Sequence, residues 1–155
     1  MRVGLGYDIH PLVKGRRFIL GGVVLPLEKG PQGHSDGDCL FHAVTDALLG
    51  AAGLGDIGHY FPDSDPRWKD ADSALFLREI RRILATKEMI IENIDANLHL
   101  EAPPLAPHLP RMLQNLSEHL GIDAGRINLK AKRGEGMDAV GHGEAVAVQA
   151  IVLLS

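Results

Sequence analysis

The sequence predicts a single α+β domain, residues 1–155, in which helices pack on one face of a mixed β-sheet. Three observations lead to this prediction: a length of 155 residues with 45% hydrophobic and 23% charged content, β-prone runs that alternate with amphipathic helical patterns, and the lack of any linker, repeat or low-complexity tract. The expected order is β, β, α, α, β, α, β, β. Three helices leave too little chain to cover the second sheet face, so we expect oligomerisation through it.

The first part of the chain is predicted to hold two β-segments and one helix. Residues 1–8 form a β-prone run, and residues 18–26 indicate a ribbon that turns at Gly21-Gly22. Apolar residues then recur at helical spacing over residues 38–52, and Gly53 follows as a stop signal. The apolar stripe of this helix consists of Leu40, Phe41, Val44, Ala47, Leu48 and Ala51.

Residues 53–72 are predicted to be a long loop, because Gly, Pro and Asp occur there without periodicity. Long loops in compact domains are commonly functional, so we expect a lid. Ser73 is expected to cap a second helix that ends near Lys87. Its predicted buried stripe is Phe76, Leu77, Ile80, Ile83 and Leu84.

The last part of the chain returns to the sheet. Apolar and polar residues alternate over 93–100, which indicates a half-buried strand. A third helix is predicted over 109–120, with Gly121 at its stop. Residues 127–131 begin the closing strands, and the apolar stretch 145–154 is about half as long as the ~20 residues of a membrane-spanning helix. It is therefore predicted to be a buried strand.

Composition narrows the functional classes. The formal net charge is −4, from 16 Lys and Arg against 20 Asp and Glu, so no basic field favours nucleic acid or an anionic membrane as a partner. Cys39 is the only cysteine, which excludes an intrachain disulfide and fits a reducing compartment. No targeting segment is visible, and we expect a cytoplasmic protein.

A metal site is predicted at the end of the first strand. Asp8 and His10 are two residues apart, which places both side chains on one side of the backbone. With His42 as third ligand they suit Zn²⁺ and leave a fourth position open, as in catalytic zinc sites. Asp38 or Asp46 is expected to orient the far ring nitrogen of this histidine. An Asp-x-His pair alone is a permissive pattern, more often a surface accident.

A phosphate site is predicted beside the metal. Residues 33–38 lead directly into the first helix, whose free N–H groups and positive dipole end attract phosphate oxygens. His34 and Ser35 can donate hydrogen bonds as well. The alternative is an exposed turn with an N-cap, and three nearby aspartates oppose unaided anion binding. A divalent cation would reverse the local electrostatics and allow acidic residues and phosphate to share one pocket.

Five motifs, read jointly, resemble those of the 2-C-methyl-D-erythritol 2,4-cyclodiphosphate synthase family. They occupy residues 6–10, 33–38, 42–50, 55–58 and 61–65, and the similarity continues through 102–103, 107–110, 128–131, Glu135 and 143–144, over essentially the whole chain. The resemblance implies that the chain converts 4-diphosphocytidyl-2-C-methyl-D-erythritol 2-phosphate to the cyclic diphosphate and CMP, in the non-mevalonate pathway to isoprenoid precursors.

The resemblance also implies a homotrimer with active sites between subunits, Zn²⁺ on Asp8, His10 and His42, and Mg²⁺ or Mn²⁺ held by Glu135 with the substrate diphosphate. His34, Lys132 and Glu135 are the implied catalytic residues. The implied substrate-binding residues are Asp8, His10, His34, Ser35, Asp56, Ile57, Gly58, Phe61, Asp63, Ala102, Pro103, Ala106, Lys132 and Arg133.

Each implied contact belongs to one part of the substrate. His34 and Ser35 would meet phosphate. Asp56 and Gly58 would hold the ribose, and Asp63 would meet the methylerythritol. The stretch 101–106 of a neighbouring subunit would receive the cytosine, mainly through its backbone.

The sequence departs from the family pattern at three places. The Thr-Thr-x stretch that usually precedes the glutamate is replaced here by Lys132, Arg133 and Gly134, before Glu135. We expect the side chains of Lys132 and Arg133 to act as charged hydrogen-bond donors to the diphosphate. Pro104 removes one backbone donor from the expected cytosine loop. Near the expected trimer axis, His142 replaces a frequent Arg and would make an anion site there sensitive to pH.

Two other functions remain open from the sequence. A metal-dependent phosphohydrolase would use metal-bound water as its nucleophile and release linear phosphates. A trimeric module that binds metal and nucleotide without catalysis would form no product. The cyclic diphosphate with CMP distinguishes the expected synthase from both.

Overall fold

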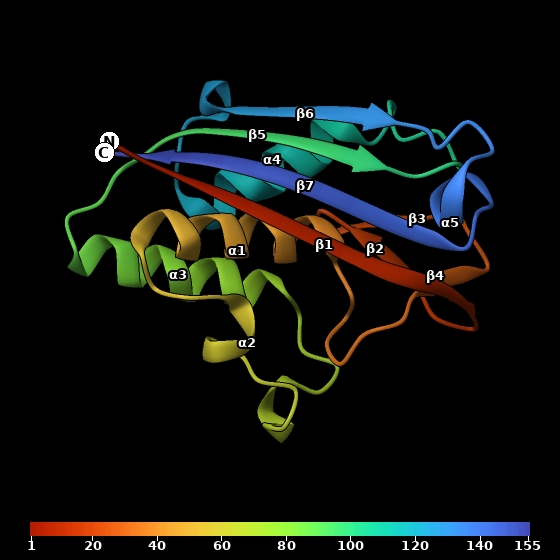
Figure 1. The fold of residues 1–155 in the computed structure, drawn as a ribbon, viewed down its shortest axis with the longest axis horizontal. Helices are drawn as coiled ribbons and strands as arrows, with labels where there is room; N and C mark the ends of the chain where they lie inside the picture. Colours follow the sequence, from red (N-terminus) through yellow and green to blue (C-terminus); the bar gives the residue numbers. More distant parts are fainter.

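The computed structural model describes residues 1–155 and has a five-stranded sheet of order β4-β1-β7-β5-β6 (Figure 1). Its strands are β1 (Arg2–Lys14), β4 (Lys29–Pro31), β5 (Ile91–His99), β6 (Ile127–Lys132) and β7 (Ala145–Leu154). Strands β5 and β6 are parallel and the other neighbours antiparallel, so the sheet is mixed, as predicted. A separate hairpin consists of β2 (Phe18–Leu20) and β3 (Val23–Leu25).

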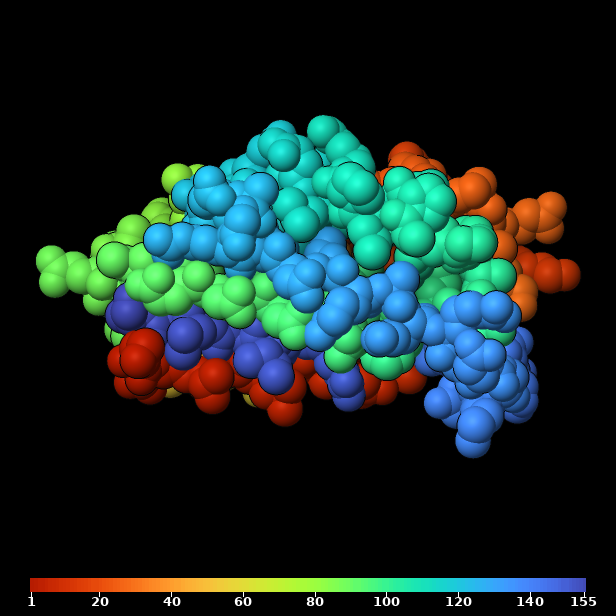
Figure 2. Space-filling model, turned by 90° about the horizontal axis from the view of Figure 1, so that it is seen from above, coloured from red at the N-terminus to blue at the C-terminus, as the bar shows by residue number.

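Three long helices cover one face of the sheet, as predicted. They are α1 (Cys39–Ala52), α3 (Ala74–Thr86) and α4 (Leu109–Leu120). The view from above shows this layering, with α4 on one side and β1 and β7 along the opposite margin (Figure 2). None of the helices combines the length and the apolar character that crossing a bilayer requires.

Strand β1 and helix α1 are in closer contact than ordinary side chains allow. A Cβ atom on Gly4 would lie 1.9 Å from the carbonyl oxygen of Ala47, and one on Gly6 would lie 1.9 Å from that of Ala43. Glycine is therefore required at both positions, because backbone atoms occupy the space of a side chain. The side of β1 that faces α1 carries Gly4, Gly6, Asp8 and His10. The two glycines allow the helix to approach the strand, and the next two residues on this side point polar groups toward it.

The predicted ribbon is confirmed and is tied to the start of α1. Gly21 and Gly22 form the hairpin turn with φ of +57° and +70°, a conformation that glycine adopts without strain. Their amides donate to the carboxylate of Asp38, at 2.9 and 2.7 Å. The same carboxylate accepts from the amide of Phe41 at 3.1 Å and so caps α1.

Several elements differ from the sequence prediction. Strand β1 continues beyond residue 8 because it pairs with β7 along its length and then with the short β4, whose three residues carry no periodic signal. The predicted loop 53–72 contains α2 (Ile57–Tyr60) and the 3₁₀ turn η1 (Pro66–Trp68). Each has an aspartate cap, from Asp56 and Asp65 respectively.

Two further short elements were not predicted. The 3₁₀ turn η2 (Ala124–Arg126) precedes β6, and α5 (Asp138–Gly141) precedes β7. Turns of three or four residues are too short to display a helical period, which is the signal on which the prediction depended.

The sheet face opposite the helices is divided into an apolar and a polar part. The apolar part is formed by exposed side chains of β1 and β7, namely Val3, Leu5, Tyr7, Ile9 and Ile151. On β5 and β6 the same face is polar, with an ion pair between Asp95 and Lys130. The segment around α5 projects beyond this face in Figure 2.

Candidate metal centre

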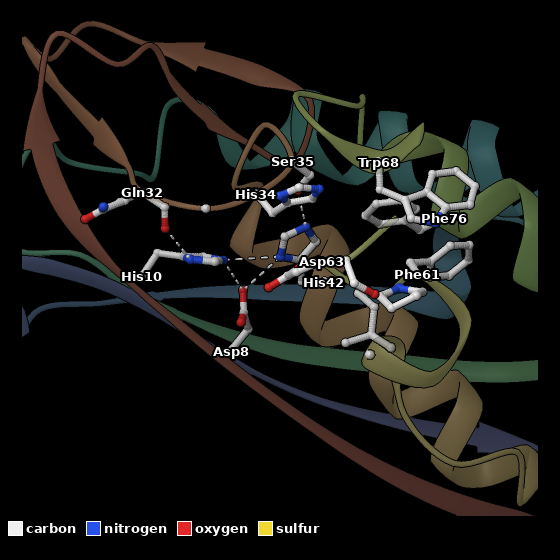
Figure 3. A pocket seen from close by; sticks show the side chains of 15 residues that line it. Asp8, His10, Gln32, His34, Ser35, His42, Phe61, Asp63, Trp68 and Phe76 are labelled. Carbon is white, nitrogen blue, oxygen red and sulfur yellow. Dashed lines mark hydrogen bonds and ion pairs between the residues drawn. The ribbon is translucent and has the colours of Figure 1, made fainter. Parts of the chain in front are cut away.

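Three side chains converge where β1 passes the start of α1 (Figure 3). The carboxylate oxygen Oδ2 of Asp8 lies 2.8 Å from Nε2 of His10 and 3.2 Å from Nδ1 of His42. The two ring nitrogens are 3.2 Å apart. One ligand atom from each residue lies within 4.8 Å of the others, so the predicted triad can hold a metal ion. No other group of three such residues does so.

The other nitrogen of each imidazole already has a partner. Nδ1 of His10 lies 2.8 Å from the carbonyl oxygen of Gln32, which can only accept a hydrogen bond. Nε2 of His42 lies 2.8 Å from the hydroxyl of Ser73 and 3.0 Å from that of Ser35. When the outer nitrogens carry the protons, the three atoms that meet in the centre carry only lone pairs. They repel one another unless a proton or a cation lies between them, and this donor set suits a divalent ion.

The sequence predicted the wrong partners for His42. Asp38 is occupied with the hairpin and helix amides, and Asp46 accepts from the amide of Ile57 at 3.1 Å. The prediction that Ser73 caps α3 is also wrong, because its side chain makes no capping bond. Asp72 accepts from the amide of Ala74 instead, at 2.9 Å. Residues four apart on a helix are neighbours, but both aspartates had closer donors.

The charges of the centre support one another. Burial by itself would raise the pKa of Asp8, but hydrogen bonds and the charges of His10 and His42 lower it well below its ordinary range. Burial also works to lower the pKa of His10, yet the hydrogen bond and charge of Asp8 raise it above the ordinary value. Near the centre, burial raises the pKa of Asp46. Burial and the nearby charge of Asp36 raise that of Asp38 to about 6.

The triad opens into a cavity of about 520 Å³ (Figure 3). The cavity brings together many of the residues predicted for the site: Asp8, His10, His34, Ser35, His42, Ile57, Gly58, Phe61 and Asp63. It is also lined by Gly33 of the predicted phosphate segment, by Pro62 and Ser64 of the 61–65 motif, and by three residues not predicted for the site, namely Gln32, Trp68 and Phe76. Nε2 of His34 is buried without a hydrogen-bond partner.

Aromatic side chains hold the 53–72 segment against α3. The rings of Phe61 and Phe76 stack with centroids 4.4 Å apart, and the ring of Trp68 meets them edge-on at 5.2 and 5.7 Å. The segment that was predicted to be a lid is therefore packed through two of its own side chains. The available sequence signal for this cluster was the pair Phe61 and Trp68 within a largely polar segment.

Three other predicted residues line a separate cavity, whereas Ala102 and Pro103 line neither cavity and Asp56 caps α2 next to Ile57. Ala106, Lys132 and Arg133 line a cavity of about 210 Å³ with Leu100, Pro104, Leu105 and Ala131. Arg133 forms an ion pair of 2.5 Å with Glu101. The amides of Gly134 and Glu135 donate to the same carboxylate, at 2.9 and 3.1 Å. Glu101 thus joins the start of the 101–106 stretch to the 132–135 turn.

Strand register gives the separation between the two places. Ile9 pairs with Ala147, which pairs with His99, which pairs with Lys132. Three strand spacings of ~4.8 Å place Lys132 about 14 Å across the sheet from β1, the strand that carries Asp8 and His10. Glu135 is exposed and belongs to no ligand cluster. A single chain therefore does not unite the predicted site.

Comparison with known proteins adds three findings. A model of the YgbB family matches residues 1–155. The 2-C-methyl-D-erythritol 2,4-cyclodiphosphate synthases of Desulfosudis oleivorans and Methylobacillus flagellatus are 56% and 53% identical to the chain, over 99% of it and 92% and 96% of their own lengths. A solved structure of such a synthase, in a CDP-bound form, matches with a TM-score of 0.91 and 42% identity, over 99% of this chain and 100% of the other.

Proposed function

The chain belongs to the YgbB family, and we propose that it acts as a 2-C-methyl-D-erythritol 2,4-cyclodiphosphate synthase of the non-mevalonate pathway. Its substrate is 4-diphosphocytidyl-2-C-methyl-D-erythritol 2-phosphate. A 2-phosphate oxygen forms a bond to the β-phosphorus of the diphosphate, the bond from that phosphorus to the bridging oxygen breaks, and CMP leaves with that oxygen. The reaction is that of a cyclising phosphorus–oxygen lyase, and it needs no protein nucleophile.

The observation that carries the proposal is the meeting of three lone pairs, from Asp8, His10 and His42, beside a cavity of about 520 Å³. We propose that Zn²⁺ binds there, and that Glu135 approaches a Mg²⁺ or Mn²⁺ together with the substrate diphosphate. When bound, such ions supply positive charge to phosphate oxygens and reduce the repulsion between the two reacting anions. The residues of the chain hold those oxygens in line for attack.

The cavity offers contacts for each part of the sugar and phosphates. His34 has a buried ring nitrogen without a partner, which supports its role as a phosphate donor. The hydroxyl of Ser35 contacts Nε2 of His42. Ser35 would therefore contact phosphate either through this same hydroxyl or through its backbone amide. Gly58 and Asp63 line the cavity with groups for ribose and methylerythritol hydroxyls, and Asp56, which does not line it, caps α2 next to the lining residue Ile57.

The packed segment 61–68 would exclude water from the reacting phosphorus. Water that reaches this atom would hydrolyse the diphosphate in competition with cyclisation. Loosening the segment with Pro62→Gly is therefore expected to raise linear product relative to cyclic product. An unchanged product ratio would contradict this role.

The second cavity is proposed to receive the cytosine of a substrate bound to another copy of the chain. Its volume of about 210 Å³ and its largely apolar lining, which includes Leu100, Pro104, Leu105 and Ala106, suit a flat base. The CDP-bound relative supports a cytidine nucleotide as ligand. Ala102, Pro103 and Ala106 belong to this stretch, and Lys132 and Arg133 border the cavity on the side proposed for the diphosphate.

We propose a homotrimer in which the triad of one copy meets the 101–106 and 132–135 segments of the next. The separation of about 14 Å across the sheet within one chain supports this arrangement. The exposed apolar part of the sheet face supports assembly through that face, since a large exposed apolar patch usually marks an interface. The mass in solution measures it directly.

Phosphorus NMR of the purified chain with substrate, Zn²⁺ and Mg²⁺ tests the function. Formation of the cyclic diphosphate and CMP in equal amounts is the expected result. Linear phosphates would identify a phosphohydrolase, and no change in the spectrum would identify a binding module. Either result would overturn the proposal.

Mixing two inactive variants tests the shared site. His42→Ala and Lys132→Glu damage different cavities, so a mixed trimer contains some junctions in which neither defect is present. Random assembly restores about one quarter of the sites. Recovery of CMP release only after subunits exchange is expected, whereas absence of recovery would place the whole site in one chain.

A further inference from the structure

Ser73 occupies an N-cap position, yet its side chain does not cap the helix. It immediately precedes α3, where a serine hydroxyl normally accepts a hydrogen bond from a helix amide. No such bond is present, and the side chain is completely buried. The hydroxyl lies 2.5 Å from Oδ1 of Asp36 and 2.8 Å from Nε2 of His42. It therefore bridges a carboxylate and a proposed metal ligand.

The direction of these hydrogen bonds follows from the number of protons. A carboxylate can only accept, so the single proton of the Ser73 hydroxyl is donated to Asp36. The hydroxyl oxygen then has only lone pairs left for His42, and Nε2 of the imidazole must be the donor. This fixes the tautomer with the proton on Nε2. Nδ1, the atom that faces Asp8 and His10, keeps its lone pair for a metal.

Asp36 is itself held in place by backbone. Its Oδ2 accepts from the amide of Ser73 at 3.1 Å, and its Oδ1 accepts from the amide of Asp38 at 3.1 Å. Ser35 also contacts Nε2 of His42, at 3.0 Å, but no carboxylate is within hydrogen-bond distance of its hydroxyl to fix its proton. Ser35 can donate or accept, so it does not determine the tautomer.

We propose that Asp36 and Ser73 are positioning residues that hold the His42 ring in place, with Nε2 protonated and Nδ1 free to bind the metal. The role rests on the proposed metal-dependent function of the same site. It assigns to Ser73 a function in place of the cap that its sequence position suggests. It also selects Asp36, rather than Asp38 or Asp46, as the acidic residue behind the ligand.

Zinc affinity of the full-length protein without substrate tests the proposal. Competition with a chromophoric chelator measures it for Ser73→Ala and Asp36→Asn. Loss of a partner behind a ligating histidine typically weakens metal binding by 10- to 100-fold, so at least about 10-fold is expected for each. Asp36→Asn is informative because its amide can donate to Ser73, which then donates to His42 and favours the wrong tautomer. Ser35→Ala is expected to have a smaller effect.

Two variants separate positioning from general damage to the start of α3. Asp72→Ala removes the hydrogen bond to Ala74 at the same helix start without touching the network, so its zinc affinity should stay within about twofold of the unsubstituted protein. Ser73→Thr keeps the hydroxyl and should restore affinity relative to Ser73→Ala. If Ser73→Thr does not fold, the zinc affinity of Asp36→Asn tests the proposal by itself. Circular dichroism checks the folding of each variant.

The visible absorption of bound Co²⁺ gives a second measurement, because it changes with ligand geometry and not with protein stability. A changed spectrum in Ser73→Ala and Asp36→Asn, with an unchanged one in Asp72→Ala, supports the role. Zinc affinity within twofold of the unsubstituted protein in both variants, or an equal loss in Asp72→Ala, would overturn it. If the chain instead formed no cyclic product but these affinities changed as stated, only the synthase proposal would fail.

Discussion

The proposed site has two halves, and they are built differently. One lies at the contact between β1 and α1, and the other at the corner formed by β6 and α5. At the first, ligand side chains are largely buried, and each ring has a fixed partner on its outer side. At the second, Lys132, Arg133 and Glu135 are exposed, and Glu101 is the side chain that ties the turn to the 101–106 stretch. The comparison shows that one chain brings the three ligands of the metal end together by itself, whereas in the proposed trimer another copy would complete the nucleotide end.

Removing a ligand should break the first region most strongly. His42→Ala deletes one of three donors and leaves Asp8 and His10 facing each other, so zinc affinity should fall by more than about 100-fold, beyond the usual effect of losing an outer partner. Isothermal titration with Zn²⁺ and an assay of CMP release measure the change. His108→Ala, a histidine beside another helix, is the control. Retained zinc affinity in His42→Ala would show that the ligands are wrongly assigned.

The close approach that builds this region can be broken without touching a ligand. A methyl group at Gly6 would meet the backbone of Ala43 at 1.9 Å, so Gly6→Ala should reduce the free energy of unfolding by at least about 3 kcal/mol. Gly50→Ala on the same helix is the matched control, because its added carbon meets only the carbonyl oxygen of Leu5, at 4.0 Å. It should be neutral or stabilise by about 0.5–1 kcal/mol. Urea denaturation measures both, and similar midpoints would contradict the packing argument.

The second region should respond in substrate affinity and not in stability. Lys132 has no ion-pair partner, whereas Arg133 is engaged with Glu101. Lys132→Ala is therefore expected to raise KM for the nucleotide substrate at least about 10-fold, because one hydrogen bond to a charged group contributes about 1.5 kcal/mol or more. Arg133→Ala should raise it less, with an unchanged melting temperature in both. A larger effect of Arg133→Ala would mean that the ion pair opens when substrate binds.

The smallest expected effect concerns the cap that holds the hairpin to α1. Because burial raises the pKa of Asp38 to about 6, above its ordinary value of 3.8, the folded state binds its proton more tightly than the unfolded state. Its contribution to stability is thus complete below pH 3.8 and is lost as pH rises through about 6. Relative to Asp38→Asn, the unsubstituted protein should lose on the order of 1 kcal/mol between pH 5 and pH 7.5. Urea midpoints at both pH values measure it, and parallel curves would contradict the shift.

Part of the metal triad could be predicted from local periodicity. A strand period of two aligns Asp8 with His10, and the helical period puts His42 on the first long helix. The long helices and the mixed sheet were predictable for the same reason. The short α5 was not, since it has four residues and begins at Asp138 with φ of +55°.

The outer partners of the ligands could not be predicted from local pattern. Ser73 is 31 residues from His42 in the chain, and three aspartates lie close enough in sequence to be candidates behind the ring. Only the folded geometry shows that Asp36 is the one that reaches the serine hydroxyl. The inward glycines of β1 do belong to a local pattern, but alternation of small residues with apolar ones predicts a strand and does not say what approaches it.

The alternation along β1 links strand register to chemistry. Shifting the strand by one residue would turn Leu5, Tyr7 and Ile9 toward α1, where there is no room for them, and would turn Asp8 and His10 out to the opposite face. A misaligned β1 would therefore be unable to bind a cation at this centre. An ion that is present while the chain folds would stabilise only the correctly aligned sheet, and so would increase its population relative to misaligned forms.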